Sequence, residues 1–240
     1  MPIKPYLQIP IADCGEPLVP IPAGTFGRVT PHPYVALGAP YGDRSPFWLR
    51  SGVLEALTQA QRRLQQRHPT YGLQIFDAYR PVAVQQFMVD RTFGELRQAQ
   101  GWGDRPLNPE ETATLWAQVH QFWAIPSPDP TQPPPHSTGA AVDLTLWDTT
   151  APLGSSLPMG SPIDECSPRS YPDHFATDPS PEGQEAHHHR CLLRQVMESA
   201  GFRCHPQEWW HFSLGDQMWA WLEGQGGSPG TIARYGPAPL

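Results

Sequence analysis

The sequence predicts an α+β fold, with a central antiparallel sheet that carries the functional residues and helices that flank it. Several segments place apolar residues at helical spacing, and shorter segments alternate like half-buried strands. Neither an internal repeat nor a linker divides the 240 residues, of which 39% are hydrophobic. A chain of this length and composition suits one large domain. We therefore expect a single domain over residues 1–240, with its core in about residues 6–220.

Four long helices are expected, over residues 53–67, 82–97, 108–125 and 184–200. The first has Val53, Leu57 and Leu64 near a period of 3.6 residues, and a His-Pro pair follows it. The second comes directly after a proline, which suits a first helical turn. Asn108 caps the third, and Gly201 closes the fourth.

Strands are expected at residues 73–79, 141–147 and 209–214. In the second of these, Val142 and Leu144 share one face, whereas Asp143 lies on the other. Residues 1–50 read as extended segments and turns that wrap onto the core. The loop over residues 148–183 is long enough to be functional or mobile. The tail over residues 224–240 reads as poorly ordered.

Composition and charge limit the partners. The net charge is −7 and no basic cluster exists, which argues against a nucleic-acid partner. No apolar run is long enough for a membrane span or a secretory signal. The four cysteines form no Cys-x-x-Cys pair, so a cysteine-rich zinc site is not expected. These features predict a cytoplasmic protein with free thiols and leave its oligomeric state open.

Two short stretches carry metal-ligand chemistry. Residues 208–212 read Glu-Trp-Trp-His-Phe, and residues 136–143 read His-Ser-Thr-Gly-Ala-Ala-Val-Asp. Two histidines and one carboxylate (His136, Asp143 and His211) make a three-ligand zinc set with one position open for water. Taken singly, the first two also read as a loop histidine and a strand-end acid.

Glu208 is a candidate base for that water. Residues three apart on a regular strand face opposite sides, so Glu208 can join His211 only from before the strand or from a bulge. A solvated surface glutamate is the alternative. The run of three histidines at residues 187–189 reads as a helix face rather than a metal tract.

Two further residues are candidates for substrate contacts. Arg80 ends an apolar strand and can bind a carboxylate or a developing oxyanion, or else pair with Asp77. Asp164 lies in the long loop and can anchor an ammonium group, although a turn acid is the simpler interpretation.

Four motifs occur in a characteristic order: Phe76-Asp-Ala-Tyr-Arg-Pro81, the His136–Asp143 stretch, Met159-Gly-Ser-Pro-Ile-Asp164 and Glu208-Trp-Trp-His-Phe212. In this order they resemble the zinc D-alanyl-D-alanine dipeptidases, the family of the vancomycin-resistance dipeptidase. The resemblance covers about residues 6–220. The wider superfamily, which includes zinc D,D-carboxypeptidases and hedgehog-like domains, shares only the two metal motifs.

The resemblance implies a role for each matching residue. One zinc ion per chain would be held by His136, Asp143 and His211, with Glu208 as the base. Arg80 would stabilise the transition state and Asp164 would bind the amino group of a small dipeptide, D-alanyl-D-alanine. The family usually has a serine two residues before the first zinc histidine, to help hold the substrate carboxylate, where this chain has Pro134. A D,D-carboxypeptidase or endopeptidase acting on peptidoglycan, and a non-catalytic zinc-binding domain, are the alternatives.

Overall fold

A computed structural model describes residues 4–151 and 155–238. Within them lies a five-stranded sheet in the order β2 (Gly27–Arg28), β4 (Tyr71–Asp77), β5 (Ala141–Asp148), β7 (Glu208–Ser213) and β6 (Arg203–His205). All neighbours are antiparallel except β2, which runs parallel to β4. Two shorter strands, β1 (Leu18–Pro20) and β3 (Trp48–Arg50), form a separate antiparallel pair. The α+β prediction is confirmed, and the short β2 makes the sheet mixed.

The expected helices are all present, with small shifts at their ends. In chain order the α-helices are α1 (Pro33–Ala36), α2 (Ser51–Arg67), α3 (Val82–Ala99), α4 (Pro109–Phe122), α5 (Pro181–Ser199) and α6 (Gln217–Gln225). Short 3-10 helices are η1 (Pro5–Gln8), η2 (Pro135–Thr138) and η3 (Pro168–Ser170). Asn108 caps α4 with a full capping box to Glu111, as its sequence indicates.

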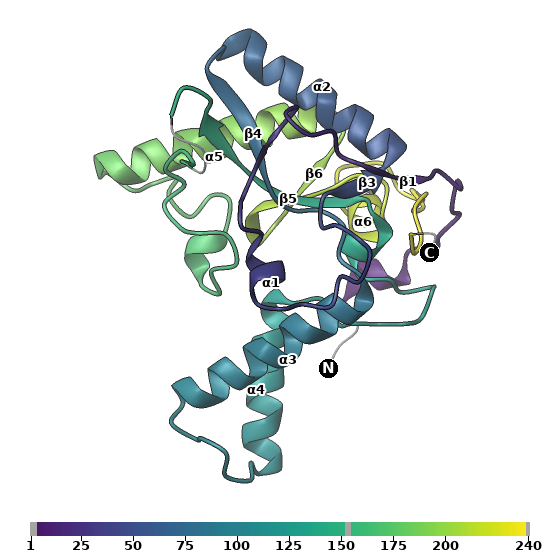
Figure 1. The fold of residues 1–240 in the computed structure, drawn as a ribbon, viewed down its shortest axis with the longest axis vertical. Coiled ribbons are helices and arrows are strands. Elements are labelled where there is room, and N and C mark those ends of the chain that lie inside the picture. The colour runs from purple at the N-terminus through teal and green to yellow at the C-terminus, as the bar shows by residue number, and fades with distance from the viewer. Residues whose placement is uncertain (1–3, 152–154, 239–240) are drawn as a thin grey trace.

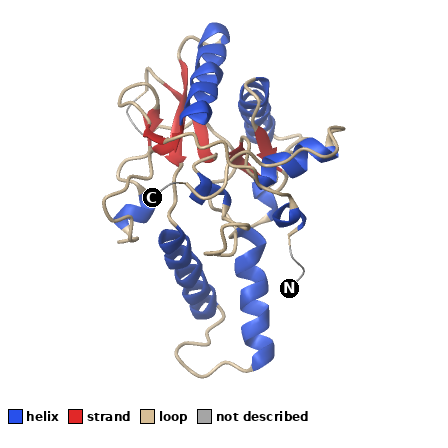
Figure 2. Ribbon diagram, turned by 90° about the vertical axis from the view of Figure 1, so that its right-hand side faces the viewer, coloured by secondary structure: helices blue, strands red, loops and turns tan. Residues whose placement is uncertain are grey.

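Helices α2 and α5 lie side by side against the sheet, whereas α3 and α4 form a hairpin that projects away from it (Figures 1 and 2). Among the described residues, no helix has the length and apolar character that crossing a membrane requires.

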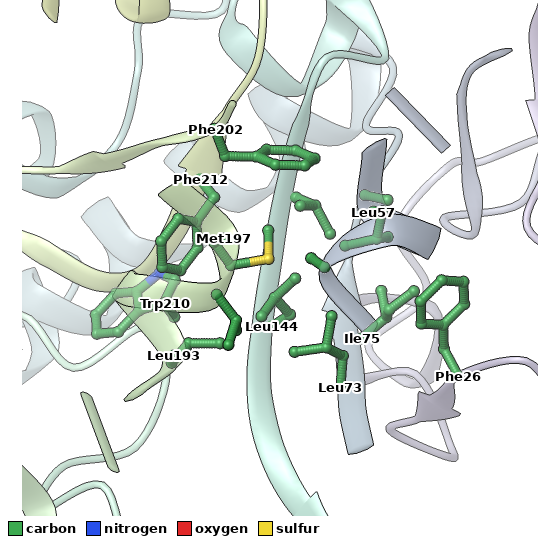
Figure 3. Packing of buried hydrophobic residues seen from close by; sticks show 14 of the residues in the cluster. Phe26, Leu57, Leu73, Ile75, Leu144, Leu193, Met197, Phe202, Trp210 and Phe212 are labelled. Carbon is green, nitrogen blue, oxygen red and sulfur yellow. The ribbon is translucent and has the colours of Figure 1, made fainter. Parts of the chain in front are cut away.

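The core lies between the sheet and the α2–α5 layer (Figure 3). Leu144 of β5 is fully buried and packs in one cluster with Leu57 of α2 and Met197 of α5. Because side chains alternate along a strand, the apolar face of β5 leaves Asp143 pointing to the opposite face. The sheet therefore places its polar residues away from the helical layer.

The tail does not behave as its sequence suggests. The backbone N–H of Ala12 donates to Ala233 O at 2.8 Å, and Tyr235 is fully buried in the core. The N–H of Ala238 donates to Ser137 O at 2.9 Å, next to the predicted ligand His136. The prediction of a poorly ordered tail is therefore wrong for residues 233–238. These residues pack back onto the core, where their backbone N–H and C=O groups form hydrogen bonds with other segments of the chain.

The long loop after β5 is largely regular where it is described. Residues 152–154, which fall within the predicted loop of 148–183, lie outside the described residues. Beyond them, η3 and a bridge between Trp147 and Ser156 organise the loop. Buried Arg190 of α5 donates to Met159 O at 2.8 Å and to Tyr171 O at 2.8 Å. These bonds hold the segment that carries Asp164 against α5.

Candidate active site

Three polar residues stand in one row across the sheet. Asp77 of β4 is the register partner of Asp143 on β5, and Asp143 is in turn the partner of His211 on β7. Directly paired residues on antiparallel strands point to the same face, with Cβ atoms about 5 Å apart. Strand register alone thus brings together two side chains that are 68 residues apart in sequence.

His136 reaches the same point from η2. Its turn needs Gly139, which has φ +71° and whose added Cβ would stand 2.5 Å from Leu18 Cδ1. His136 Nδ1 lies 2.7 Å from Ala78 O, so Nδ1 carries the proton and donates to this carbonyl. The lone pair of His136 Nε2 is then free and faces the row on the sheet.

The three side chains converge closely. His136 Nε2 lies 3.1 Å from Asp143 Oδ2 and 3.1 Å from His211 Nδ1. His211 Nδ1 lies 2.9 Å from Asp143 Oδ1. All three residues are at most 5% exposed. Their ligand atoms form a group that can hold a metal ion.

The second nitrogen of His211 is also oriented. Ser213 Oγ donates to Asp216 Oδ2 at 2.8 Å, which leaves its lone pairs facing His211 Nε2 at 3.4 Å. This arrangement favours the proton of neutral His211 on Nε2 and the lone pair on Nδ1. Metal-binding histidines usually donate their second N–H in this way.

The donor set fits a cation. With both histidines neutral, two imidazole lone pairs and a carboxylate meet with no proton between them, which only a positive charge makes favourable. The pKa shifts of the ligands also indicate a site that attracts positive charge. Burial would raise the pKa of Asp143, but His136 and His211 outweigh it and hold the pKa below its usual value. Burial would likewise lower the pKa of His211, but the neighbouring Asp143 carboxylate outweighs it and raises the pKa, so this imidazole attracts positive charge.

Glu208 shares the site because the strand pair is irregular. The register of β6 and β7 shifts between Cys204 and His205, which pairs His205 with Glu208. Glu208 Oε2 then lies 4.0 Å from His211 Nδ1, and Oε1 lies 4.0 Å from His205 Nδ1. Burial raises the pKa of Glu208 to about 7. A carboxylate with such a pKa is suited to taking and returning a proton near neutral pH.

Arg80 is held rigidly beside the metal set. Arg80 is 4% exposed, and its guanidinium lies over the rings of Tyr34 and Trp123, 4.9 and 5.2 Å from their centroids. It donates from Nε to Asp77 Oδ2 at 2.8 Å, from Nη1 to Gln85 Oε1 at 2.9 Å, and from Nη2 to Asp143 Oδ2 at 3.3 Å and Tyr34 Oη at 3.3 Å. The ion pair with Asp77, one of the two interpretations of the sequence, is present, and Arg80 also lines the pocket.

Asp164 faces the same pocket from the long loop. Its backbone has φ +66°, an uncommon conformation for a residue other than glycine that is often found at functional sites. Tyr34 donates to Asp164 Oδ2 at 2.7 Å. Burial, reinforced by the charge of Asp143, raises the pKa of Asp164 to about 7.

Comparison with known proteins decides the family. The model of the D-ala-D-ala dipeptidase family matches residues 28–225. The chain is 50% identical over 230 residues to the D-alanyl-D-alanine dipeptidase of Synechocystis sp., which covers 93% of this chain and 92% of the relative. This chain belongs to the D-ala-D-ala dipeptidase family.

A second member of the D-ala-D-ala dipeptidase family, from Enterococcus faecium, is 33% identical over 148 residues, which cover 61% of this chain and 64% of the relative. Among solved structures, the LD-carboxypeptidase LdcB aligns at a TM-score of 0.48 and 12% identity, over 92% of this chain and 77% of that chain. A likeness this distant has no bearing on function.

All six predicted site residues line one pocket of this family member: Arg80, His136, Asp143, Asp164, Glu208 and His211. Pro134 lines it too. The three consecutive histidines lie on α5, where His189 contacts Pro158 O at 2.8 Å. Among the described residues, the possible metal cluster does not include them.

Three residues that contact the predicted site residues were not recognised as part of the site from the sequence. Tyr34 belongs to a short apolar run whose spacing gives no sign of its contacts with Arg80 and Asp164. Asp77 was considered only as an ion-pair partner, yet it also accepts from Tyr41 at 3.2 Å. His205 lies on an edge strand outside every motif. Only Asp77, within the Asp-Ala-Tyr-Arg stretch, carried a usable signal.

Proposed function

We propose that this member of the D-ala-D-ala dipeptidase family hydrolyses D-alanyl-D-alanine to free D-alanine, with a zinc ion held by His136, Asp143 and His211. The observation that carries the proposal is the convergence of three buried acceptor atoms beside Glu208. The relative from Synechocystis sp. carries the name of this activity and aligns over nearly the whole chain.

The residues present fit zinc, which favours histidine nitrogen and carboxylate oxygen. Ala78 O accepts a hydrogen bond from His136 Nδ1–H, and Ser213 Oγ accepts one from His211 Nε2–H. The other nitrogen of each ring therefore has a free lone pair that can bind a cation. A zinc ion supplies Lewis acidity, which polarises a carbonyl and makes water more acidic.

Glu208 is the proposed base. Its carboxylate lies 4.0 Å from the ligand atom of His211 and lines the pocket. It takes a proton from the attacking water and delivers that proton to the nitrogen of the leaving D-alanine. Transfer in both directions is efficient because the pKa of Glu208 is raised by burial to about 7.

Arg80 is the proposed electrostatic stabiliser. A guanidinium has five N–H groups, and the contacts of Arg80 with described residues use Nε–H, one hydrogen of Nη1 and both of Nη2. The second hydrogen of Nη1 remains for the oxygen that becomes negative during attack. Because the guanidinium is already fixed, it needs no reorganisation when the charge develops.

Asp164 is the proposed anchor for the free amino group. Asp164 lines the same pocket as the metal ligand Asp143, whose charge contributes to the raised pKa of Asp164. A substrate ammonium would stabilise its ionised form. A required amino terminus next to the scissile bond limits substrates to dipeptides. We place the reaction in the cytoplasm, where free D-alanyl-D-alanine is made as a cell-wall precursor.

The test is release of free alanine from D-Ala-D-Ala, L-Ala-L-Ala and N-acetyl-D-Ala-D-Ala, before and after chelation and after zinc is restored. Zinc-dependent cleavage of unblocked D-Ala-D-Ala alone is expected. Cleavage of the acetylated substrate would instead indicate a carboxypeptidase, and would remove the role of Asp164. Failure to cut any substrate, with zinc bound, would overturn the proposed activity.

A further inference from the structure

We propose that Lys4 binds the C-terminal carboxylate of the substrate and so sets the enzyme's preference for dipeptides with a free carboxyl end. The inference rests on the proposed function and deepens it, because the metal set and Asp164 account only for the scissile bond and the amino end. A D-alanyl-D-alanine zwitterion also presents a negative charge that a half-buried pocket must match.

Lys4 is the only lysine in the sequence, and it lies in the active-site pocket. Its backbone is extended, with φ −59° and ψ 131°, as the following Pro5 requires. It precedes η1 as the N-terminal flanking residue. A side chain at this position projects from the end of a short, proline-started helix rather than from a free strand.

The segment that carries Lys4 is firmly held. Gln217 of α6, itself buried, donates from Nε2 to Ile9 O at 2.6 Å and to Thr131 O at 3.0 Å. Tyr6 in η1 is 5% exposed and lines the same pocket. The ends of the chain also pair, because Ile11 forms a bridge with Ala233. Lys4 is therefore positioned by buried contacts on the residues that follow it.

Lys4 and Arg80, the two lysine and arginine side chains that line the pocket, differ in their ion pairs. The guanidinium of Arg80 is already bound by Asp77 and Asp143. Lys4, by contrast, makes no hydrogen bond or ion pair with any side chain in the described part of the chain. Burial lowers the pKa of Lys4, and the charge of Glu208 opposes this effect. The Lys4 side chain thus shares the pocket with Glu208, and Asp164 is hydrogen-bonded by Tyr34.

The two prolines of the pocket lining cannot replace the ammonium. Pro134 and Pro135 both line the pocket, and a proline has no backbone N–H to offer a carboxylate. Among the lysine and arginine side chains that line the pocket in the described residues, Lys4 is the one that forms no ion pair.

The experiment compares D-Ala-D-Ala with its C-terminal amide, D-Ala-D-Ala-NH2, on the zinc-loaded enzyme and its Lys4→Met and Lys4→Arg variants. Methionine keeps the apolar stem and removes the charge, whereas arginine restores the charge. For Lys4→Met we expect KM for D-Ala-D-Ala to rise about 10- to 100-fold, as for loss of a hydrogen bond to a charged group, with a much smaller change in kcat. The amide has no carboxylate, so its KM should hardly respond to the same substitution. Lys4→Arg should recover most of the loss.

Arg62→Met is the matched control, because Arg62 is an exposed cation on α2 outside the pocket. Equal losses on both substrates in Lys4→Met would show a merely structural role and overturn the proposal. An unchanged KM for D-Ala-D-Ala would overturn it as well. If the unmodified enzyme cuts neither substrate with zinc bound, the proposed function itself fails, and that result is distinct from the first two.

Discussion

Replacing Arg50 by methionine should destabilise the protein strongly, although Arg50 is not part of the pocket. The side chain is 1% exposed and ties three distant segments together. It donates to Thr138 O (2.8 Å), Glu16 O (2.6 Å), Asp13 Oδ2 (3.0 Å), Gly236 O (3.1 Å) and Pro237 O (3.0 Å). These contacts join the N-terminal segment, the end of η2 and the returning tail.

The loss in the free energy of unfolding follows from the hydrogen bonds that methionine does not make. Its stem fills the same space, so little packing is lost, but the carbonyls of Thr138 and Gly236 lose a charged donor. Each buried acceptor left without a partner costs about 1–3 kcal/mol, whereas the Asp13 carboxylate, which is 34% exposed, keeps its contact with water. Because some carbonyls can turn to water, we expect a total of about 3–5 kcal/mol. For a chain of this size that corresponds to a fall in Tm of roughly 6–20 °C.

Urea unfolding followed by tryptophan fluorescence measures this loss, since the chain has nine tryptophans. The protein should be metal-free, because bound metal adds a concentration-dependent term to the free energy of unfolding. Arg62→Met on α2 is the control and should change this free energy by less than about 0.5 kcal/mol, as exposed substitutions do. If Arg50→Met lowers the free energy of unfolding by less than about 1 kcal/mol, the hydrogen bonds of this guanidinium do not stabilise the packing of the tail and η2.

Two further predictions concern the acids of the site. Burial raises the pKa of folded Asp164 from its ordinary 3.8 to about 7. Its protonated form therefore stabilises the fold below about pH 4, and this contribution is lost as pH rises to about 7. In metal-free protein, Asp164→Asn should thus become about 2–4 kcal/mol more stable relative to the parent between pH 4 and pH 8, and parallel pH curves would contradict this. Asp77→Asn removes the buried partner of Arg80 Nε and should lower kcat about 10- to 100-fold while zinc content stays unchanged; normal kcat would remove Asp77 from the support of Arg80.

Much of the fold was predictable because its long elements are strongly periodic. The faces of α2 and β5 follow from residues such as Leu57 and Leu144, which recur at the spacing of a buried helix face and a buried strand face. The two-residue β2 was not predictable, since a pair such as Gly27-Arg28 carries no period.

The tail was misjudged for a related reason. Glycine and proline between residues 224 and 238 suggest disorder by composition, yet Tyr235 finds a buried place and Gly236 accepts from Arg50. Such long-range contacts depend on residues nearly 190 positions away, which no local pattern encodes. The single-domain organisation and the cytoplasmic location stay predictions.

The candidate site was largely predictable from its motifs, but its geometry was not. The spacing of Glu208 and His211 posed a conflict with strand alternation that the irregular pairing at His205 resolves. Tyr34 could not be found, because its value lies in contacts with Arg80 and Asp164 rather than in its neighbours in sequence.

In the proposed site, the metal ligands and the base are different residues. The most direct measurement is zinc content and turnover of D-Ala-D-Ala side by side in Glu208→Gln and His211→Ala. We expect Glu208→Gln to keep about one zinc per chain and to lose about 10²- to 10⁴-fold in turnover, the usual contribution of a general base. His211→Ala should lose both zinc and activity. Full turnover in Glu208→Gln, or unchanged zinc content in His211→Ala, would contradict this division of roles.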